Sequence, residues 1–314
     1  MLRPEVRLEW FVSFLGVIDT GSFSAAAEAV HRSQPRVSTH VAALEREAGV
    51  PLFDRSKRPV EPTEAGSVLA EHARSILRAL NSAEEAMAGR RGAARGVVTL
   101  GSYPSASAAF IPALLDRLAR RSPDIKVALL ERSTLELDAA LHHGEIDVCL
   151  RPMAPPIGPA ARSRPLWREP LCVVHTPEHP LAGLPEPLPV ASVAEHPLIT
   201  IGRLGAPEAL GFETYKVFRE HGFEVEAVQA TNQPQTLISL VRHHIGVGVT
   251  NKLAVFTADT SGVRVRRLAE GCGRRVAVLW DSSRPLKPAA RTLLREICEA
   301  PLPPGAEPLG ETER

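Results

Sequence analysis

The chain has 314 residues, of which 44% are hydrophobic and 23% are charged, and its net charge is +1. This composition is that of a globular protein of two or three domains, and the charge alone does not indicate a nucleic-acid binder. No stretch approaches the ~20 apolar residues that a membrane span needs, and the N-terminus MLRPEVRLEWF lacks the apolar run of a signal peptide. We therefore expect a cytoplasmic protein with no membrane partner.

The cysteines and histidines do not indicate a metal site. The four cysteines are scattered and none forms a CxxC pair, so buried, reduced thiols are expected. The histidine doublets at 142–143 and 243–244 would point about 100° apart on a helix, which is poor geometry for one metal ion. We expect neither a metal nor a cofactor.

Three helices are predicted near the N-terminus. Residues 8–19 repeat apolar side chains at helical spacing, and Gly21 ends this helix. Ser22 is a suitable N-cap for a second, alanine-rich helix, which is followed by a turn at 31–33. A third helix is expected over 34–48, because its first turn tolerates proline and Ser33 can cap it.

The third helix has one apolar face and one face of small, hydrogen-bonding side chains with an arginine. Such a face suits the major groove of DNA, the alternative being an ordinary solvated helix face. Two short strands around a basic turn at 56–58 then form a wing, whose cations would contact phosphates. The candidate DNA-binding residues are Ser22, Ser33, Gln34, Pro35, Arg36, Ser38, Thr39 and His40, with Arg55, Lys57 and Arg58 in the wing.

Residues 63–89 are predicted to form one long helix, with Thr63 as its cap. Apolar residues spaced 4, 3, 4, 3 and 4 apart form a heptad seam, which favours pairing with a second copy over packing on its own chain. A two-fold dimer would present two reading helices to two DNA half-sites. The predicted seam consists of Leu69, Ala73, Ile76, Leu80, Ala83 and Met87.

After a polar hinge the pattern changes to α/β. A βαβαβ unit with a parallel sheet is expected, and a proline-rich run at 152–165 ends it. A second α/β unit follows, and the tail 301–314 should be loose. The predicted strands are 97–101, 126–131, 146–150, 171–174, 197–201, 224–230, 247–250 and 276–280, and the helices are 106–121, 134–143, 212–220, 235–244 and 287–299.

These residues resemble a known family, the LysR-type transcriptional regulators. The specific motifs are GSFSAAAEAVHRSQPRVSTHVAALEREAGVPLFDR with the following PTEAG, and the more diffuse ones are HHGEIDVCL, EHPLA, VRHHIGVGV and SRPLKPAARTLL. The resemblance implies an α/β protein with an N-terminal winged helix-turn-helix and a two-lobed effector domain like type-2 periplasmic binding proteins. Its implied parts are a DNA-binding domain at 1–62, a dimerising linker helix at 63–91, a hinge at 92–96, lobe I at 97–166 with 271–300, lobe II at 167–270 and a flexible tail at 301–314.

The reading helix departs from the commonest family pattern. After Ser-Gln-Pro the family usually has a small residue and then Leu or Ala-Ser-Arg-Gln-Ile, whereas this chain has RVSTHV at 36–41. The usual arginine after the serine is absent, and Arg36 supplies one elsewhere. The family's DNA sequence preference is therefore not carried over.

In such a two-lobed fold an effector would bind where helix N-termini converge, because their unpaired N–H groups favour anions. Ser102 and Thr134 match the family's effector-binding positions best. For each serine or threonine the alternative is a simple helix cap. The candidate effector-binding residues are Ser102, Tyr103, Ser105, Ser133, Thr134, Arg151, Thr200, Gly202, Arg203, Thr231 and Asn232.

Two classes of function follow from these patterns. The first is a transcriptional regulator that binds promoter DNA and a small, anionic effector, and that forms a dimer or, as the resemblance favours, a tetramer. RNA polymerase is a further candidate partner. The second is an enzyme or a binding protein without a DNA role, but the sequence contains no GxSxG, P-loop or HExxH motif.

Overall fold

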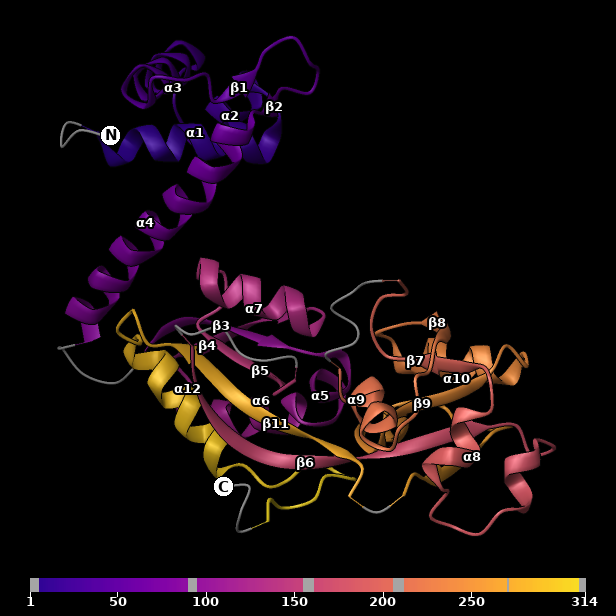
Figure 1. Cartoon of the computed structure of the whole chain (residues 1–314). Helices are drawn as coiled ribbons and strands as arrows, with labels where there is room; N and C mark the ends of the chain where they lie inside the picture. Colours follow the sequence, from indigo (N-terminus) through magenta and orange to yellow (C-terminus); the bar gives the residue numbers. More distant parts are fainter. Residues whose placement is uncertain (1–5, 90–94, 155–160, 206–211, 270, 311–314) are drawn as a thin grey trace. The chain divides into compact units, whose positions relative to one another are not determined.

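The computed structural model describes residues 6–89, 95–154, 161–205, 212–269 and 271–310. The chain divides into two compact units, residues 1–91 and 92–314 (Figure 1). No single described helix is long and apolar enough to span a membrane. Leu8–Thr20 and Phe23–Ala29 pass that test only as a pair, and they are bent by 119°.

The first unit is a winged helix-turn-helix followed by a long helix, as predicted. Phe14, Val17, Val37, Val41 and Leu44 are fully buried where the first three helices meet. The elements are α1 (Leu8–Thr20), α2 (Phe23–Ala29), α3 (Gln34–Ala48), β1 (Phe53–Asp54), β2 (Glu61–Pro62) and α4 (Glu64–Gly89).

The start of α4 is fixed to the segment before the wing. The Oγ1 of Thr63 accepts a hydrogen bond from the N–H of Gly66 at 3.0 Å, and its hydroxyl donates to the Pro51 carbonyl at 2.8 Å. At Gly66 a β-carbon would lie only 2.0 Å from the Leu52 carbonyl oxygen. Only glycine allows the two backbones to approach this closely.

The second unit contains two α/β lobes that share strands. The order of the large sheet is β4-β3-β5-β11-β6-β9-β7-β8, with β10 paired to β6. β3 runs parallel to β4 and β5, and β7 runs parallel to β8 and β9. The strands are β3 (Gly96–Ser102), β4 (Ile125–Glu131), β5 (Val148–Pro152), β6 (Ala161–His175), β7 (Leu198–Thr200), β8 (Ala227–Ala230), β9 (Val247–Asn251), β10 (Arg264–Arg267) and β11 (Gly273–Asp281).

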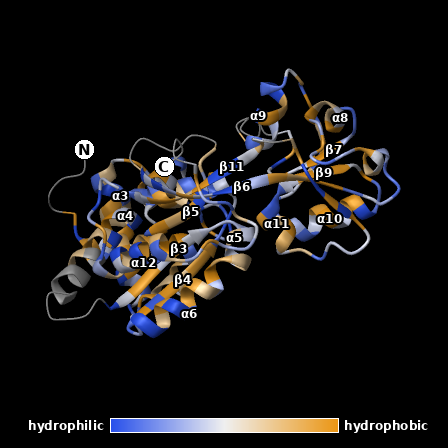
Figure 2. Ribbon diagram, turned by 90° about the horizontal axis from the view of Figure 1, so that it is seen from below, coloured by the Kyte–Doolittle hydropathy of each residue, from blue (hydrophilic) through white to orange (hydrophobic). Residues whose placement is uncertain are grey.

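Helices cover the faces of this sheet. In Figure 2 the strands β3 and β5 are mainly hydrophobic, as expected for strands that are covered by helices. The helices are α5 (Pro104–Ala109), α6 (Ile111–Arg121), α7 (Thr134–His143), η1 (Pro180–Gly183), α8 (Val190–Ala194), α9 (Glu213–Glu220), α10 (Pro234–Arg242), α11 (Lys252–Phe256) and α12 (Pro288–Glu299).

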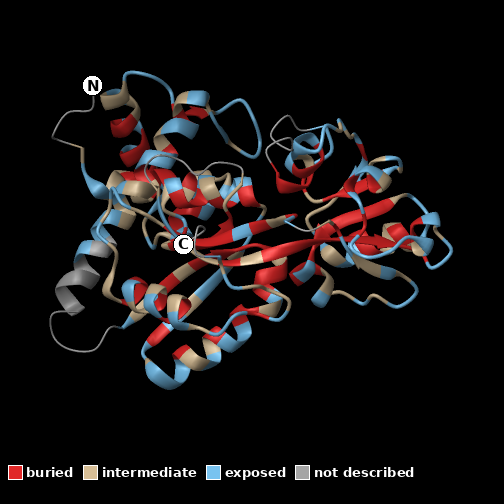
Figure 3. Cartoon of the chain, turned by 60° about the horizontal axis from the view of Figure 1, so that its bottom comes forward, coloured by how far each residue is buried: buried red, intermediate tan, exposed pale blue. Residues whose placement is uncertain are grey.

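The strands β6 and β11 connect the two lobes. β11 pairs antiparallel with the first part of β6, and the last part of β6 pairs with β9 and β10 in lobe II. Residues 169–175 of β6 are all buried, and Figure 3 shows strands that are largely red in the middle of the second unit. The lobes therefore share a common core of two crossing strands, as the family resemblance implies.

Two expectations about the strands and helices of this unit were wrong, and four short elements were missed. The predicted helix at 106–121 is split into α5 and α6 at Phe110, because Pro112 lacks an N–H and starts a new first turn. The proline-rich run at 152–165 does not end the first α/β unit, because the strand β6 begins within this run, at Ala161. The short elements η1, α8, α11 and β10 were not predicted at all.

The C-terminal tail is attached over its described part, residues 301–310. Glu307 and Arg168 exchange two backbone hydrogen bonds of 2.8 and 2.9 Å, and their side chains form an ion pair at 3.5 Å. The expectation of a loose tail was therefore wrong for these residues, because the tail adds a one-residue bridge to the edge of β6.

Candidate nucleic-acid interface and effector pocket

The N-terminal half of α3 presents its polar side chains to solvent. Ser33, Gln34, Pro35, Arg36 and Thr39 are exposed, and Ser38 is partly exposed. The opposite face is held in the core, so this half of the helix has a defined orientation. The Ser22 hydroxyl oxygen accepts from the Ala25 N–H at 3.4 Å as predicted, whereas the Ser33 side chain makes no capping bond.

Arg36 is the one arginine among the exposed residues at the start of α3. Its guanidinium lies 3.5 Å from Glu9 Oε2, which also receives Arg32 at 3.3 Å. Exposed ion pairs of this kind contribute only about 0–1 kcal/mol. The Arg36 side chain can therefore exchange Glu9 for a base or a phosphate at little cost.

His40 does not belong to the exposed face, which corrects the sequence-based expectation. Its side chain is only 6% exposed, and its Nδ1 is hydrogen-bonded to the Ser13 hydroxyl at 2.8 Å. Burial lowers the pKa of this imidazole because it disfavours the charged form. His40 thus connects α3 to α1.

The cations of the wing are all exposed, but two of them already have acidic neighbours. Arg55 pairs with Glu45 at 2.9 Å, and Lys57 pairs with Glu61 at 2.5 Å. Arg58 forms no ion pair with any residue in the described part of the chain. The wing is therefore able to offer positive charge to phosphates, most directly through Arg58.

The predicted heptad seam divides into two parts. Ala73 is fully buried and Leu69 is partly buried in the core of the first unit, so these two residues pack on their own chain. The assignment of Ala73 to a dimer seam was wrong, whereas that of Leu69 stays a prediction, because Leu69 also lines an open groove. Ile76, Leu80 and Ala83 are exposed, and the Met87 side chain lies outside the described residues.

The exposed apolar strip on α4 extends toward the wing. Val68 and Val50 are exposed beside a groove of about 470 Å³, which is lined by Ala48, Val50, Leu52, Glu64, Ala65, Val68, Leu69 and His72. Ile76 and Leu80, which are also exposed, follow further along the same helix. Several large apolar side chains exposed along one helix indicate an interaction surface.

A pocket of about 30 Å³ lies between the two lobes of the second unit. Six predicted residues line it, and four that sequence reasoning missed also line it. The six are Tyr103, Ser105, Ser133, Thr134, Thr231 and Asn232, and the four are Gln233, Thr250, Asn251 and Arg274. Its other lining residues are Pro104, Ile201, Pro234, Leu237 and Ala254.

Five predicted residues lie outside the lining. Ser102 and Thr200 are fully buried, and their hydroxyls contact the Tyr103 carbonyl and the Tyr215 hydroxyl at 3.4 and 3.3 Å. Arg151 is fully buried in an ion pair with Asp138 at 2.6 Å. The other two are Gly202, which packs against Phe212, and the exposed Arg203.

Hydrogen-bond donors gather in the pocket. Thr134 and Pro234 begin the helices α7 and α10, whose N-terminal N–H groups carry a partial positive charge. The Oδ1 of Asn251 accepts from the Ala254 N–H at 2.8 Å, which leaves its buried Nδ2 without a partner among the described residues. The buried Thr250 hydroxyl also lacks one. Such buried orphans are costly unless a ligand or water satisfies them.

Arg274 lines this pocket and is held by a buried carboxylate. Its Nε donates to Glu169 Oε2 at 2.8 Å, and its guanidinium lies over the Tyr103 ring at 4.9 Å. Glu169 Oε1 also accepts from the Tyr103 hydroxyl at 2.5 Å and from the Trp167 indole at 3.0 Å. The two terminal nitrogens of Arg274 make no hydrogen bond to a described residue, so they are available to a ligand in the pocket.

Tyr103 and Glu213, which are close to this ion pair, both have raised pKa values. Burial, together with the neighbouring Glu169 carboxylate, raises the pKa of Tyr103 and keeps its hydroxyl a donor. Burial also raises the pKa of Glu213, although the positive charge of Arg274 partly opposes this shift. The Oε1 of Glu213 is buried with no hydrogen-bond partner among the described atoms.

The chain belongs to the LysR family of regulators. Residues 8–67 match the family model of bacterial regulatory helix-turn-helix proteins of the lysR family, and residues 91–300 match that of the LysR substrate binding domain. The chain is therefore a DNA-binding transcriptional regulator with a separate substrate-binding domain, and the α/β two-lobed fold is that of the family.

Individual relatives agree with this assignment. The chain is 31% identical to the HTH-type transcriptional regulator ShiR of Corynebacterium glutamicum, covering 78% of this chain and 82% of the relative. It is 29% identical to a probable hydrogen peroxide-inducible genes activator of Mycobacterium leprae, covering 91% and 92%. The solved structure of full-length CbnR with its target DNA shares the fold, with a TM-score of 0.69 at 20% identity over 93% of this chain and 98% of that one.

The raised pKa of Glu213 predicts a pH-dependent stability. Deprotonation costs more in the folded than in the unfolded chain, so the contribution of this group is present below its ordinary pKa of 4.5 and is lost as pH rises through the folded pKa. The free energy of unfolding should fall by about 1.4 kcal/mol for each pH unit that separates the ordinary pKa from the folded pKa. Urea unfolding from about pH 4 to about pH 8 measures this fall.

The Glu213→Gln variant should lack this part of the pH dependence. The exposed Glu178 supplies the control, because Glu178→Gln should keep the wild-type profile. If Glu213→Gln shows the same slope as the wild type, the Glu213 carboxyl does not titrate as described.

Proposed function

We propose that the exposed first half of α3 reads promoter DNA while the pocket between the lobes senses a small anionic molecule. The carrying observation for the reading role is the contrast between the two faces of α3. Val37, Val41 and Leu44 are fully buried, whereas Arg36 and Thr39 are exposed. An exposed helix end of this size fits the major groove, and the wing cations Arg55, Lys57 and Arg58 would contact phosphates.

The anionic character of the effector is supported by the donors in the pocket. Arg274, the Nδ2 of Asn251 and the N-terminus of α7 all offer hydrogens or positive charge to the same small space. No histidine, cysteine or carboxylate is among the described lining residues. The pocket therefore favours an acceptor-rich ligand such as a carboxylate, and it offers no general base for catalysis.

Binding would be coupled to the conformation of the lobes. An effector in the pocket would contact Thr134 of lobe I and Thr231 of lobe II together, so it would bind the closed arrangement more tightly than the open one. Only such a difference in affinity shifts a conformational equilibrium. Lobe closure is one of the common ways in which ligand binding is transmitted.

A two-fold dimer would use the exposed strip on α4. Ile76 and Leu80 are unpaired within the described residues, and Val68 extends the strip. Only about two-fifths to one-half of each side chain is left to bury, so each contributes roughly 1 kcal/mol to an interface. A dimer supplies two reading helices, a tetramer would pair two such dimers, and RNA polymerase is a further proposed partner.

Arg36→Ala should weaken binding to a target promoter by about 1 kcal/mol or more if Arg36 contacts a base. Fluorescence anisotropy with a fragment chosen by mapping bound genomic DNA measures the loss. Arg74→Ala, which removes a partly exposed arginine of α4 that pairs with Asp19 of α1, should have no comparable effect. Unchanged affinity and unchanged sequence preference for Arg36→Ala would remove Arg36 from the reading surface.

Asn251→Asp should abolish effector binding with little change in fold. The aspartate keeps the acceptor that caps α11, but it replaces the orphan Nδ2 donor by a negative charge. A thermal-shift screen of small mono- and dicarboxylates should identify a ligand that stabilises the wild type and not the variant. DNA binding without a ligand should be retained. A ligand that stabilises both proteins equally would place the site elsewhere.

Leu80→Asp should dissociate the dimer, because a charge in an apolar interface is left unpaired. Sedimentation velocity over a range of concentrations measures the mass. Ser67→Asp introduces the same charge at another exposed position of α4 and should remain dimeric. A Leu80→Asp protein that is still dimeric would mean that α4 does not pair through this strip.

A further inference from the structure

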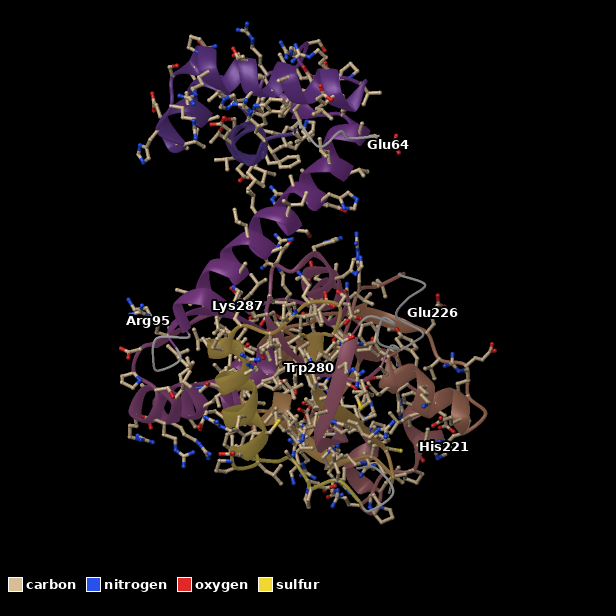
Figure 4. All side chains as sticks on the ribbon, turned by 90° about the vertical axis from the view of Figure 1, so that its left-hand side faces the viewer. Glu64, Arg95, His221, Glu226, Trp280 and Lys287 are labelled. Atoms are coloured by element: carbon tan, nitrogen blue, oxygen red, sulfur yellow. The ribbon has the colours of Figure 1, made fainter. Side chains whose placement is uncertain are left out.

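A second groove, separate from the pocket between the lobes, lies on lobe I. It has a volume of about 400 Å³ and lies between the first part of β6, the end of β11 and the helix α12. Figure 4 labels Trp280, which lines the groove, and Lys287, which precedes α12. The lining residues are Arg164, Trp280, Arg291, Leu294, Arg295, Cys298 and Glu299.

The spacing of these residues explains why they face one groove. Arg291, Leu294, Arg295 and Cys298 follow one another at intervals of 3, 1 and 3, which places them on one side of α12. The other side of α12 is buried in the core of lobe I. The groove is therefore built from the outward ridge of a firmly packed helix.

The sheet contributes further arginines on the same side. Trp280 is directly opposite Arg162 in the antiparallel pairing of β11 with β6, and Val278 is opposite Arg164. Residues that are opposite, or two apart, project from the same face of a sheet. Arg162 and Arg164 thus lie on the face that carries Trp280.

The groove has an excess of positive charge. Arg162, Arg164, Arg291 and Arg295 form no ion pair with any described residue, and Arg164 is hydrogen-bonded to Cys298. The one acid in the lining, Glu299, is already shared by Arg117 and Arg121 at 3.2 and 3.6 Å. The arginines around the Trp280 ring repel one another, so a binding partner of negative charge would reduce this repulsion.

We propose that this groove binds an acidic segment of another polypeptide, with one apolar side chain of that segment placed against Trp280. Trp and Arg are the residues most enriched at the energetic centres of protein interfaces. Guanidinium groups pair with carboxylates in a two-pronged geometry. A DNA backbone offers phosphates but no protruding apolar group to fill the space between Trp280 and Leu294.

The test uses the full-length protein and a short fluorescein-labelled peptide of glutamates around one central phenylalanine. Fluorescence anisotropy should show binding to the wild type. The Arg291→Glu, Arg295→Glu double variant should weaken binding by about tenfold or more, because two favourable charge contacts become repulsive. A peptide with alanine in place of the phenylalanine should also bind more weakly to the wild type.

The matched control is Arg264→Glu with Arg275→Glu, which makes the same charge change at two exposed arginines outside the groove. This variant should bind the peptide like the wild type. Three results would overturn the proposal: no peptide binding, equal loss in the control variant, or equal binding of the alanine peptide. A loss of affinity for a short DNA duplex in the groove variant alone would also overturn it, in favour of a phosphate-binding surface.

Discussion

The buried ion pair between Glu169 and Arg274 joins the two strands that cross from lobe to lobe, β6 and β11. Removing one partner of such a pair typically costs about 3–5 kcal/mol, because the other charge is left uncompensated. Glu169 also accepts from Tyr103 and Trp167, so the same carboxylate orients Tyr103 of lobe I and a tryptophan of its own strand. The same ion pair therefore connects the two crossing strands and holds an arginine that lines the pocket.

This shared structure has consequences for sensing. Arg274 donates from its Nε to Glu169 and also lines the pocket. Tyr103 both lines the pocket and donates to Glu169. An anionic ligand that pairs with Arg274 would therefore weaken the ion pair between Arg274 and Glu169, which holds the crossing strands. The ligand and these strands would be coupled through one side chain.

The sequence predicted the order of the large elements well, because their apolar periodicity is strong. It failed where packing decides the outcome. Ala73 has the spacing of a dimer seam, yet it is fully buried in the core of its own unit, and His40 looked like a flank of the reading face but is buried against Ser13. Periodicity identifies which face of a helix is apolar, but it does not identify which neighbour covers that face.

The pocket shows the same limit. Sequence reasoning found the residues at helix starts, since turn chemistry is local, and six of them line the pocket. It missed Arg274, Thr250 and Asn251, because each lies in or at the end of a strand, where nothing local marks it as facing a ligand. Arg151 was chosen for its charge, but Asp138 on α7 already neutralises it. Such pairings depend on contacts between distant segments.

The close contact between Gly66 and the Leu52 carbonyl has a mechanical meaning. Because backbone lies against backbone there, no side chain at that position can rotate to absorb a change in angle. The Thr63 hydroxyl fastens the same joint from the other side. Helix α4 and the winged helix-turn-helix should therefore rotate as one rigid body. A small rotation of the C-terminal end of α4 would then also rotate α3.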